Sequence, residues 1–341
     1  MPDLVVLISA FVVSVVLTGL IRRYAIKTSL LDIPNHRSSH QLPTPRGGGV
    51  AIVAVFSVAS IALVLTGTIG WSVFWAIFGG SLIVSGISYW DDHGHVSALW
   101  RFLVHIISAV WVVWWVGSIA PVNLGVITLD LGWGRAVVTV LFIVWMLNLY
   151  NFMDGIDGIA GVQAVSVAFG LAAILAFQGE SGLALWLAVL GTASAGFLAW
   201  NWPPAKIFMG DVGSSFLGFV FAAFAVLSHN EGSVTLWVWL IMCSVFIADA
   251  SFTLFYRVLK GHKWHQPHRT HAYQWASRYF SSHKLVTLSV LAINGLWLFP
   301  LAWYASIEPD YGFYLWLVAC TPLFFLVIRF NAGRPESVPA G

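Results

Sequence analysis

Charged residues are scarce in this chain. Asp, Glu, Lys and Arg together make up 9% of its 341 residues, against about a quarter in ordinary globular proteins. Hydrophobic residues account for 59%, so the composition excludes a soluble enzyme, and we expect no nucleic-acid partner. Cysteine is rare too: Cys243 and Cys320 both lie in apolar segments, which predicts neither a disulfide nor a metal site for them.

Internal repeats, low-complexity tracts and long hydrophilic segments are absent from the sequence, so we expect one integral membrane domain over residues 1–341. Its apolar segments are long enough, or nearly so, to cross a hydrocarbon layer of about 30 Å at about 1.5 Å per residue. They predict an all-α, polytopic bundle of about eleven transmembrane helices. The eleven segments are 3–21, 48–67, 71–90, 99–118, 136–152, 158–178, 182–200, 213–228, 234–256, 285–305 and 311–329.

Basic residues are nearly absent from one side of this predicted bundle. With the N-terminus outside and the C-terminus cytoplasmic, fifteen of the sixteen Lys and Arg lie in or beside the inner loops, and only Arg135 lies outside. This matches the excess of positive charge on cytoplasmic loops of membrane proteins. We therefore expect the chemistry at the cytoplasmic face. The inner loops are 22–47, 91–98, 153–157, 201–212, 257–284 and the tail from 330.

The first inner loop ends in three glycines that open the second span. Gly47–Gly49 stand next to Arg46, so a helix start with free N–H groups and a cation suits a phosphate. The alternative is a positively charged anchor followed by a turn. Two adjacent acids, Asp91 and Asp92, end the third span. A carboxylate in a bilayer is costly, about 2.5–3.5 kcal/mol at the centre, so we expect a cation or a basic partner; the alternative is a solvated loop.

Three polar residues spaced by three form the strongest local signal. On a helix, Asn151, Asp154 and Asp157 fall along one stripe about 120° wide, which is typical of a hard-cation or nucleotide site. Further on, Asp211 precedes a span whose first turn holds Ser214. An aspartate beside helix-start N–H groups suits a metal-bound phosphate, although an ordinary N-cap explains it as well.

The last inner loop is rich in histidine. Pro267 excludes a single helix through all of the histidines in this loop. A structural zinc site needs a closed set of ligands. We therefore favour a short helix from about His268, with His268, Arg269 and His271 near its start as phosphate-binding groups. The alternative is zinc. The histidines recur at three-residue intervals: His262, His265, His268 and His271.

One acid lies within a predicted span instead of at its end. Asp249 is roughly two turns from the inner end of segment 234–256, where an unpaired carboxylate is expensive. We expect Asp249 to pair with a basic residue such as Arg257, or to take part in the site.

Together these motifs resemble the cytoplasmic motifs of the polyprenyl-phosphate N-acetylhexosamine-1-phosphate transferases. The resemblance runs from about residue 32 to 275, and eleven spans fit the branch that initiates O-antigen chains. Four separated motifs agree in order, which makes the resemblance specific. The motifs are Asp91-Asp92, Asn151-Phe-Met-Asp154-Gly-Ile-Asp157-Gly, Phe208-Met-Gly-Asp211-Val-Gly-Ser and His268-Arg-Thr-His271-Ala-Tyr-Gln.

The resemblance implies a reaction and its participants. A UDP-N-acetyl sugar meets undecaprenyl phosphate at the inner face of a bacterial inner membrane, UMP leaves, and a lipid-diphosphate sugar remains. The implied cofactor is Mg²⁺, with Mn²⁺ as the alternative metal, and a homodimer is left open. Asp211 and Asp154 are the implied metal ligands, and Asp91, Asp92 and Asp154 the implied catalytic groups. The implied substrate-binding residues are His40, Arg46, Asn151, Asp157, Asn201, Phe208, His268, Arg269 and His271.

The motif 268–274 departs from one branch of the family. Where the muramoyl-pentapeptide transferases of peptidoglycan synthesis carry consecutive histidines, this chain reads His-Arg-Thr-His-Ala-Tyr-Gln, which is most similar to the branch that uses 6-deoxy N-acetyl sugars. Outside the family, a secondary transporter also combines many spans with embedded acids, but its acids lie near the midplane, often within repeats. A non-catalytic scaffold for glycan enzymes is a third reading.

Overall fold

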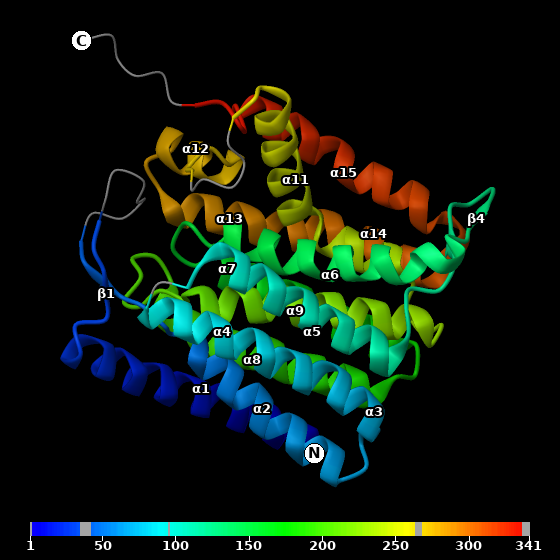
Figure 1. The fold of residues 1–341 in the computed structure, drawn as a ribbon, viewed down its shortest axis with the longest axis horizontal. Coiled ribbons are helices and arrows are strands. Elements are labelled where there is room, and N and C mark those ends of the chain that lie inside the picture. The colour runs from blue at the N-terminus through cyan, green and yellow to red at the C-terminus, as the bar shows by residue number, and fades with distance from the viewer. Residues whose placement is uncertain (1, 35–41, 95, 263–267, 336–341) are drawn as a thin grey trace.

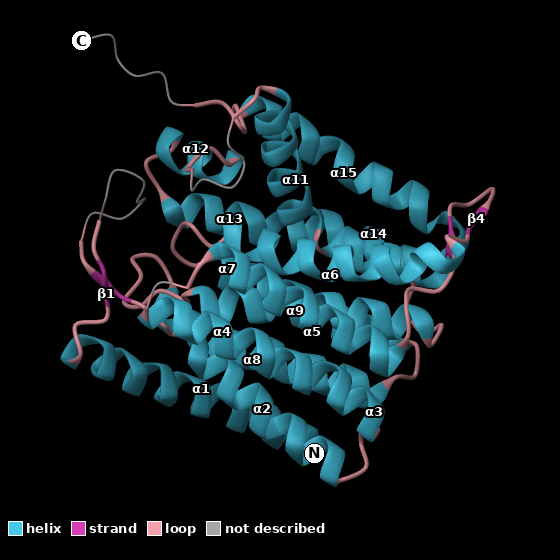
Figure 2. Ribbon diagram, in the orientation of Figure 1, coloured by secondary structure: helices cyan, strands magenta, loops and turns pink. Residues whose placement is uncertain are grey.

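The computed structural model describes residues 2–34, 42–94, 96–262 and 268–335. Within these ranges the chain is largely helical, and Figure 2 shows strand only as two short antiparallel pairs. The long helices lie side by side in one bundle and alternate in direction along the chain (Figure 1). This confirms the all-α, polytopic fold. The strand pairs are β1 (Leu31–Asp32) with β2 (Thr44–Pro45), and β3 (Val122–Asn123) with β4 (Thr128–Leu129).

Most of the predicted segments form a single helix, and two contain a π-helical turn. The π-helical turns are η1 (Trp75–Gly79) and η3 (Asn294–Leu298), and the short 3-10 turns are η2 (Gly132–Gly134) and η4 (Pro309–Tyr311). The α-helices are α1 (Pro2–Lys27), α2 (Gly49–Leu65), α3 (Trp71–Phe74), α4 (Gly80–His93), α5 (Ala98–Val116), α6 (Arg135–Phe152), α7 (Ile159–Phe177), α8 (Ser181–Asn201), α9 (Asp211–Asn230), α10 (Leu236–Met242), α11 (Ser244–Leu259), α12 (Ala272–Tyr279), α13 (His283–Ile293), α14 (Phe299–Ile307) and α15 (Gly312–Arg329).

All eleven predicted segments are helical, but they do not all qualify equally as spans. In the described chain nine helical segments are long and apolar enough to cross a membrane, and α10 with α11 makes a tenth only as a pair bent by 79°. α2 has 17 residues and covers only about 26 Å at about 1.5 Å per residue. The segment 234–256, predicted as one continuous span, is broken at Cys243.

Polar side chains from two neighbouring helices compensate this break. The Gln163 side chain of α7 donates through Nε2 to the carbonyl of Met242 at 3.2 Å, where α10 ends. Asn294, the first residue of η3, donates through Nδ2 to Gln163 Oε1 at 2.8 Å. Inside a bilayer a backbone group that leaves its helix needs such a partner. The break lets α11 stand steeply across the other helices (Figure 1).

α9 is the central helix of the bundle. Of its most apolar stretch 94% is buried, whereas the value for α1 is 17%. α1 is therefore peripheral. α9 is apolar on all sides, as expected for a buried helix. Glycines let the neighbouring backbones approach α9. A Cβ on Gly218 would lie 2.8 Å from Leu147 Cα of α6, and Gly49 of α2 faces Gly213. The N-terminal end of α9 is thereby fixed among α2, α4 and α6.

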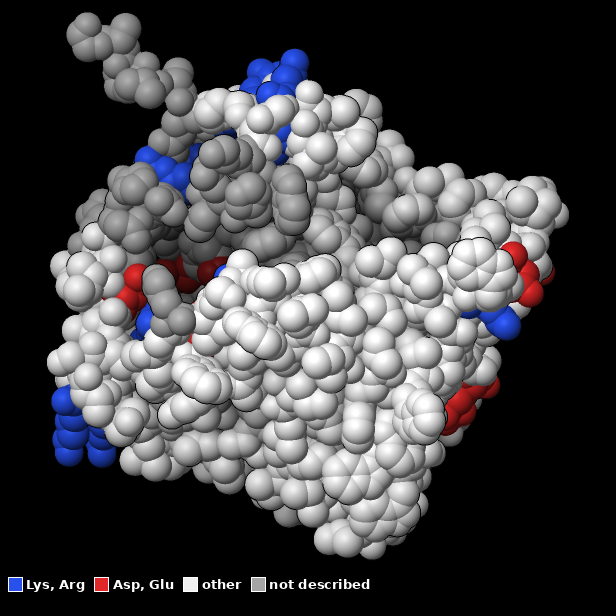
Figure 3. Space-filling view, in the orientation of Figure 1, with Lys and Arg blue, Asp and Glu red and all other residues white. Residues whose placement is uncertain are grey.

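The two ends of the bundle differ in charge. Figure 3 shows basic side chains gathered mainly at the end that holds α12 and the C-terminal end of α1, together with an acidic patch in a hollow at that same end. The opposite end shows little basic colour and separate acidic groups. The asymmetry agrees with the loop charges of the sequence, and the orientation across the membrane stays a prediction.

Candidate active site

Asp92 lies in the last turn of α4 and caps the start of α9. It is 4% exposed, and its carboxylate accepts the N–H groups of Asp211 and Val212, each at 3.3 Å. A carboxylate at this position is stabilised by the free N–H groups and by the helix dipole. In the structure Asp92 accepts these two N–H groups, and the contact with a metal-bound phosphate predicted for this helix start stays a prediction.

The start of α2 is occupied in the same way. The N–H groups of Gly48 and Gly49 donate to the carbonyls of Phe208 and Met209, each at 2.9 Å. These N–H groups thus hold the segment before α9, and the predicted phosphate contact at this helix start is not formed by them. Arg46 points to the same place, because its Nη2 donates to the backbone carbonyl of Asp92.

Arg101, in the first turn of α5, joins two acids from different helices. Its Nη1 contacts the carboxylate of Asp91 and lies 3.3 Å from Oδ2 of Asp211. The sequence analysis counted Arg101 only as a basic residue at an inner helix end and missed it as a site residue. A signal was present: Arg101 is the one basic residue of segment 99–118, and it begins the helix that follows the paired acids.

Asn151 and Asp154 belong to different local structures. α6 ends at Phe152, so the predicted single helical stripe is wrong: the chain turns through 153–158 and enters α7 at Gly158, which has a φ of +78°. A positive φ is strained for a residue with a side chain. Asn151 still faces the site, because its Nδ2 donates to Ser214 Oγ of α9 at 3.0 Å.

Carboxylates from three elements meet at this point. Burial, followed by the negative charges of Asp211, Asp92 and Asp157, raises the pKa of Asp154 well above its ordinary value. A carboxylate shifted by neighbouring carboxylates is short of compensating positive charge. The hollow at this end of the bundle therefore favours a cation or a cationic group beside Asp154, which lies within the electrostatic influence of Asp211 and Asp92.

Asp157 and Asn201 hold the surrounding loops together. Asp157 accepts the N–H of Ala205 at 3.1 Å and pairs with His283 Nδ1 at 3.4 Å. Asn201 is buried; its Oδ1 accepts the N–H of Gly158, and its Nδ2 donates to a carbonyl of the next loop. These contacts give both residues a structural role, and their predicted contact with substrate stays a prediction.

Phe208 is half-buried beside the start of α2, where its N–H donates to the carbonyl of Pro45 at 2.8 Å. Its predicted contact with substrate stays a prediction. His40, also predicted to bind substrate, lies outside the described residues.

The histidine segment forms a shorter helix than predicted. α12 begins at Ala272 with His271 as its N-cap, not at His268. The ring of His268 stacks on that of His271 at 5.0 Å. Burial, and then the neighbouring charges of His271 and Arg257, lower the pKa of His268 to about 3. With this pKa His268 is neutral near pH 7 and is available as a hydrogen-bonding group, and its predicted contact with phosphate stays a prediction.

Asp249 pairs with this segment. His271 Nδ1 lies 3.2 Å from Asp249 Oδ1, and the N–H groups of Ala272 and Tyr273 donate to the two carboxylate oxygens at 2.9 Å. The partner is therefore His271 together with the helix start of α12, and not Arg257, which was the example given for a basic partner.

The acidic cluster offers carboxylate oxygens, the ligand type that Mg²⁺ takes, and the predicted binding of Mg²⁺ stays a prediction. Within the described ranges no three His, Cys, Asp or Glu side chains form a set that could hold a metal ion; His265, a member of the predicted zinc alternative, lies outside these ranges, so that alternative stays open. Mg²⁺ is usually held by one or two carboxylates and keeps waters or phosphates as its other ligands. The positive charges of Arg46 and Arg101 interact electrostatically with this group of carboxylates. The carboxylates are those of Asp91, Asp92, Asp154 and Asp211.

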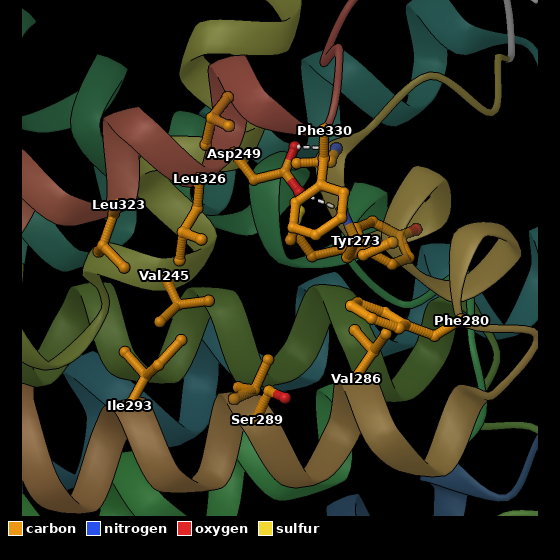
Figure 4. Close-up of a pocket in the computed structure, with 15 residues that line it drawn as sticks. Val245, Asp249, Tyr273, Phe280, Val286, Ser289, Ile293, Leu323, Leu326 and Phe330 are labelled. Atoms are coloured by element: carbon orange, nitrogen blue, oxygen red, sulfur yellow. Dashed lines mark hydrogen bonds between the residues drawn. The ribbon is translucent and has the colours of Figure 1, made fainter.

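An apolar cavity of about 270 Å³ adjoins the site. It is lined by α11, α12, α13 and α15, and Figure 4 shows aliphatic side chains such as Val245, Ile293 and Leu326 surrounding it, with Asp249 and Tyr273 at one edge. Met153, from the loop that carries Asp154, also lines it. The cavity is therefore adjacent in the chain to Asp154 through Met153.

Comparison with known proteins agrees with this geometry. Residues 74–229 match the model of glycosyl transferase family 4. The chain is 31% identical over 298 residues to a probable undecaprenyl-phosphate N-acetylglucosaminyl 1-phosphate transferase of Bacillus subtilis, covering 84% of this chain and 82% of that one. It is 29% identical over 315 residues to the undecaprenyl-phosphate alpha-N-acetylglucosaminyl 1-phosphate transferase of Salmonella typhi, covering 85% and 82%. A phospho-N-acetylmuramoyl-pentapeptide-transferase of Geobacillus thermodenitrificans is 30% identical over 273 residues, covering 68% and 78%. The chain therefore belongs to glycosyl transferase family 4, as a polytopic membrane protein related to the polyprenyl-phosphate N-acetylglucosamine-1-phosphate transferases.

Proposed function

We propose that this protein transfers an N-acetylhexosamine 1-phosphate from a UDP-sugar to undecaprenyl phosphate at the cytoplasmic face of a bacterial inner membrane. UMP is released, and the product starts a lipid-linked surface glycan such as O-antigen. The observation that carries the proposal is the meeting of Asp92, Asp154 and Asp211, from three separate elements, at one end of a membrane bundle. The names of the relatives support the donor and acceptor classes.

The reaction joins two anions, so the site must supply positive charge. A phosphate oxygen of the lipid attacks the sugar-bearing phosphorus, and the bond to UMP breaks. Mg²⁺, when bound, supplies charge that neutralises the diphosphate as UMP departs. Asp211, with Asp154 as a second ligand, would hold it. Arg101 contacts Asp211 already and is placed to meet the diphosphate; a fixed cation of this kind stabilises developing charge on phosphate oxygens.

Asp91 and Asp92 differ in what they are free to do. Asp92 is fixed by the start of α9, so it positions the acceptor phosphate and the Asp211 backbone. Asp91 is more accessible and is bound to Arg101. A phosphate monoester is largely dianionic near pH 7 because its second pKa is about 6. Positioning therefore suits both aspartates better than proton removal.

The cavity beside the site can bind the isoprenoid chain of the lipid acceptor. Its lining is almost entirely apolar, and two of its lining residues, Phe280 and Leu326, are exposed on the surface of the protein. The first isoprene units of undecaprenyl phosphate would lie in this cavity, next to Met153 and Tyr273.

The identity of the transferred sugar is less well defined than the nucleotide and the lipid acceptor. Relatives named as N-acetylglucosaminyl 1-phosphate transferases support UDP-N-acetylglucosamine, whereas the 268–274 motif favours a 6-deoxy N-acetyl sugar. Mass spectrometry of the lipid product from a panel of UDP-sugars separates the two.

Transport is the second candidate, and the bent pair α10–α11 with a buried acid favours it, because broken helices with embedded charge are typical of transporters. The test is UMP release by the purified protein. We expect release only when a UDP-N-acetylhexosamine, undecaprenyl phosphate and Mg²⁺ are all present, and none in EDTA. No release with any N-acetylhexosamine would refute the transferase and favour transport.

A further inference from the structure

Asp249 is a carboxylate inside a membrane span that the transfer reaction, as outlined above, does not use. It is 4% exposed and lies in α11, beyond the bend. A charged side chain in the middle of a span is costly unless it is paired, and such residues are mostly functional. The partners of Asp249 therefore indicate what it does.

With one exception, the hydrogen-bonding partners of Asp249 in the structure come from the segment that starts α12. Oδ1 accepts the N–H of Ala272 at 2.9 Å and lies 3.2 Å from His271 Nδ1, and Oδ2 accepts the N–H of Tyr273 at 2.9 Å. The exception is Thr253, one turn along α11, whose hydroxyl donates to Oδ1 at 3.0 Å. Figure 4 shows the carboxylate turned toward the backbone beside Tyr273.

Both residues that Asp249 holds reach the loop that carries Asp154. The His271 ring stacks on the ring of Phe152, with centroids 6.5 Å apart and planes 28° apart. The Tyr273 hydroxyl donates to the carbonyl of Phe152 at 3.0 Å. Phe152 ends α6, two residues before Asp154. A residue of α11 is thus connected to the candidate site by two separate contacts.

We propose that Asp249 is a positioning residue for the transfer reaction and acts through His271; this rests on the proposed function. Because the carboxylate faces Nδ1, that nitrogen carries a hydrogen, and it is the imidazolium form, with a second hydrogen on Nε2, that can donate to a phosphate oxygen. A carboxylate behind an imidazole also supports positive charge on the ring. The carboxylate thus serves both the two N–H groups of the helix start and the imidazole, and the proposal concerns its contact with the imidazole.

A double-mutant cycle in the purified, full-length protein tests this. Asp249→Asn keeps the size of the side chain and removes its charge, and His271→Ala removes the group on which it acts. We expect each change to lower kcat for UMP release about 10- to 100-fold with the KM for the UDP-sugar little changed, and the double variant to be no slower than His271→Ala. Thr253→Val, which removes a hydrogen bond to the same oxygen without touching His271, is the matched control and keeps turnover close to that of the unmodified protein.

Losses that multiply in the double variant, or normal turnover of Asp249→Asn, would overturn the inference. ¹⁵N-histidine NMR of the unmodified protein, with His271→Ala used to assign the signal, is independent of whether the Asp249 variant folds. We expect Nδ1 of His271 to be protonated, and an unprotonated Nδ1 would overturn the inference. If the unmodified protein releases no UMP, the proposed function fails, while the NMR measurement still decides the contact between Asp249 and His271.

Discussion

Gly210 is the residue whose replacement by alanine tests the placement of Asp92 most sharply. Its backbone has a φ of +77° and a ψ of 168°, a region that is essentially restricted to glycine and costs about 1–3 kcal/mol for other residues. A Cβ there would lie 2.8 Å from Asp92 Oδ2 and 3.2 Å from the backbone nitrogen of Gly47. The carboxylate must therefore move away from the start of α9.

We expect Gly210→Ala to lower both stability and rate. Backbone strain of about 1–3 kcal/mol lowers the free energy of unfolding, and a shift of about 1 Å in a positioned group lowers the rate about 10²-fold. The assay is UMP release together with the thermal unfolding midpoint in detergent. Gly86→Ala is the matched control: Gly86 lies in α4 with nothing within 4 Å of an added Cβ, and alanine in a helix is favourable by about 0.5–1 kcal/mol.

Unchanged turnover and an unchanged unfolding midpoint for Gly210→Ala would refute this reasoning. The placement of Asp92 against α9 would then not matter for the reaction. A loss of stability with full turnover would leave Asp92 a structural role only.

Three other predictions follow from the site. Arg101→Gln lowers kcat/KM for the UDP-sugar about 10- to 100-fold, because it removes the charge beside Asp211, and Arg101→Lys recovers part of the loss; steady-state kinetics measure both. Ser289→Trp, at the edge of the cavity, raises the KM for undecaprenyl phosphate, whereas Leu288→Trp, on the same exposed face but outside the cavity lining, does not. The pKa of Asp154 is raised, so this residue loses its charge, as the pH falls, at a pH above the ordinary range for aspartate. The acid limb of the rate profile therefore lies at a higher pH than an ordinary aspartate would give. Added Mg²⁺ moves this limb to lower pH. A flat profile, or a limb that does not respond to Mg²⁺, contradicts the placement of Asp154 at the metal.

The helices and their polar ends are predictable from the sequence, because both follow from local composition. Long apolar segments place the spans, and the acids at 91–92, 154 and 211 identify the end of the bundle where the site forms. The same reasoning does not show which partner each polar group finds. The N–H groups at the starts of α2 and α9 look free in the sequence, but they are used by the segment 208–209 and by Asp92, which approach from distant parts of the chain.

Two other features depend on contacts between distant segments. The break at Cys243 follows no proline or glycine, and its compensation by Gln163 comes from α7. Arg101 reads as one more basic loop residue until the packing of α4, α5 and α9 brings it to Asp91 and Asp211. The break at Cys243 and the position of Arg101 are therefore determined by tertiary contacts and not by local propensity.

The central claim is that aspartates from separate elements form one catalytic site, and turnover of single aspartate variants tests it directly. We predict that Asp211→Ala and Asp154→Ala each reduce UMP release at least about 10²-fold, the size expected for loss of a positioned electrostatic group. Asp310→Ala, at the opposite end of the bundle, keeps full turnover. Near-normal turnover of either Asp211→Ala or Asp154→Ala, in protein that remains folded, would contradict the account.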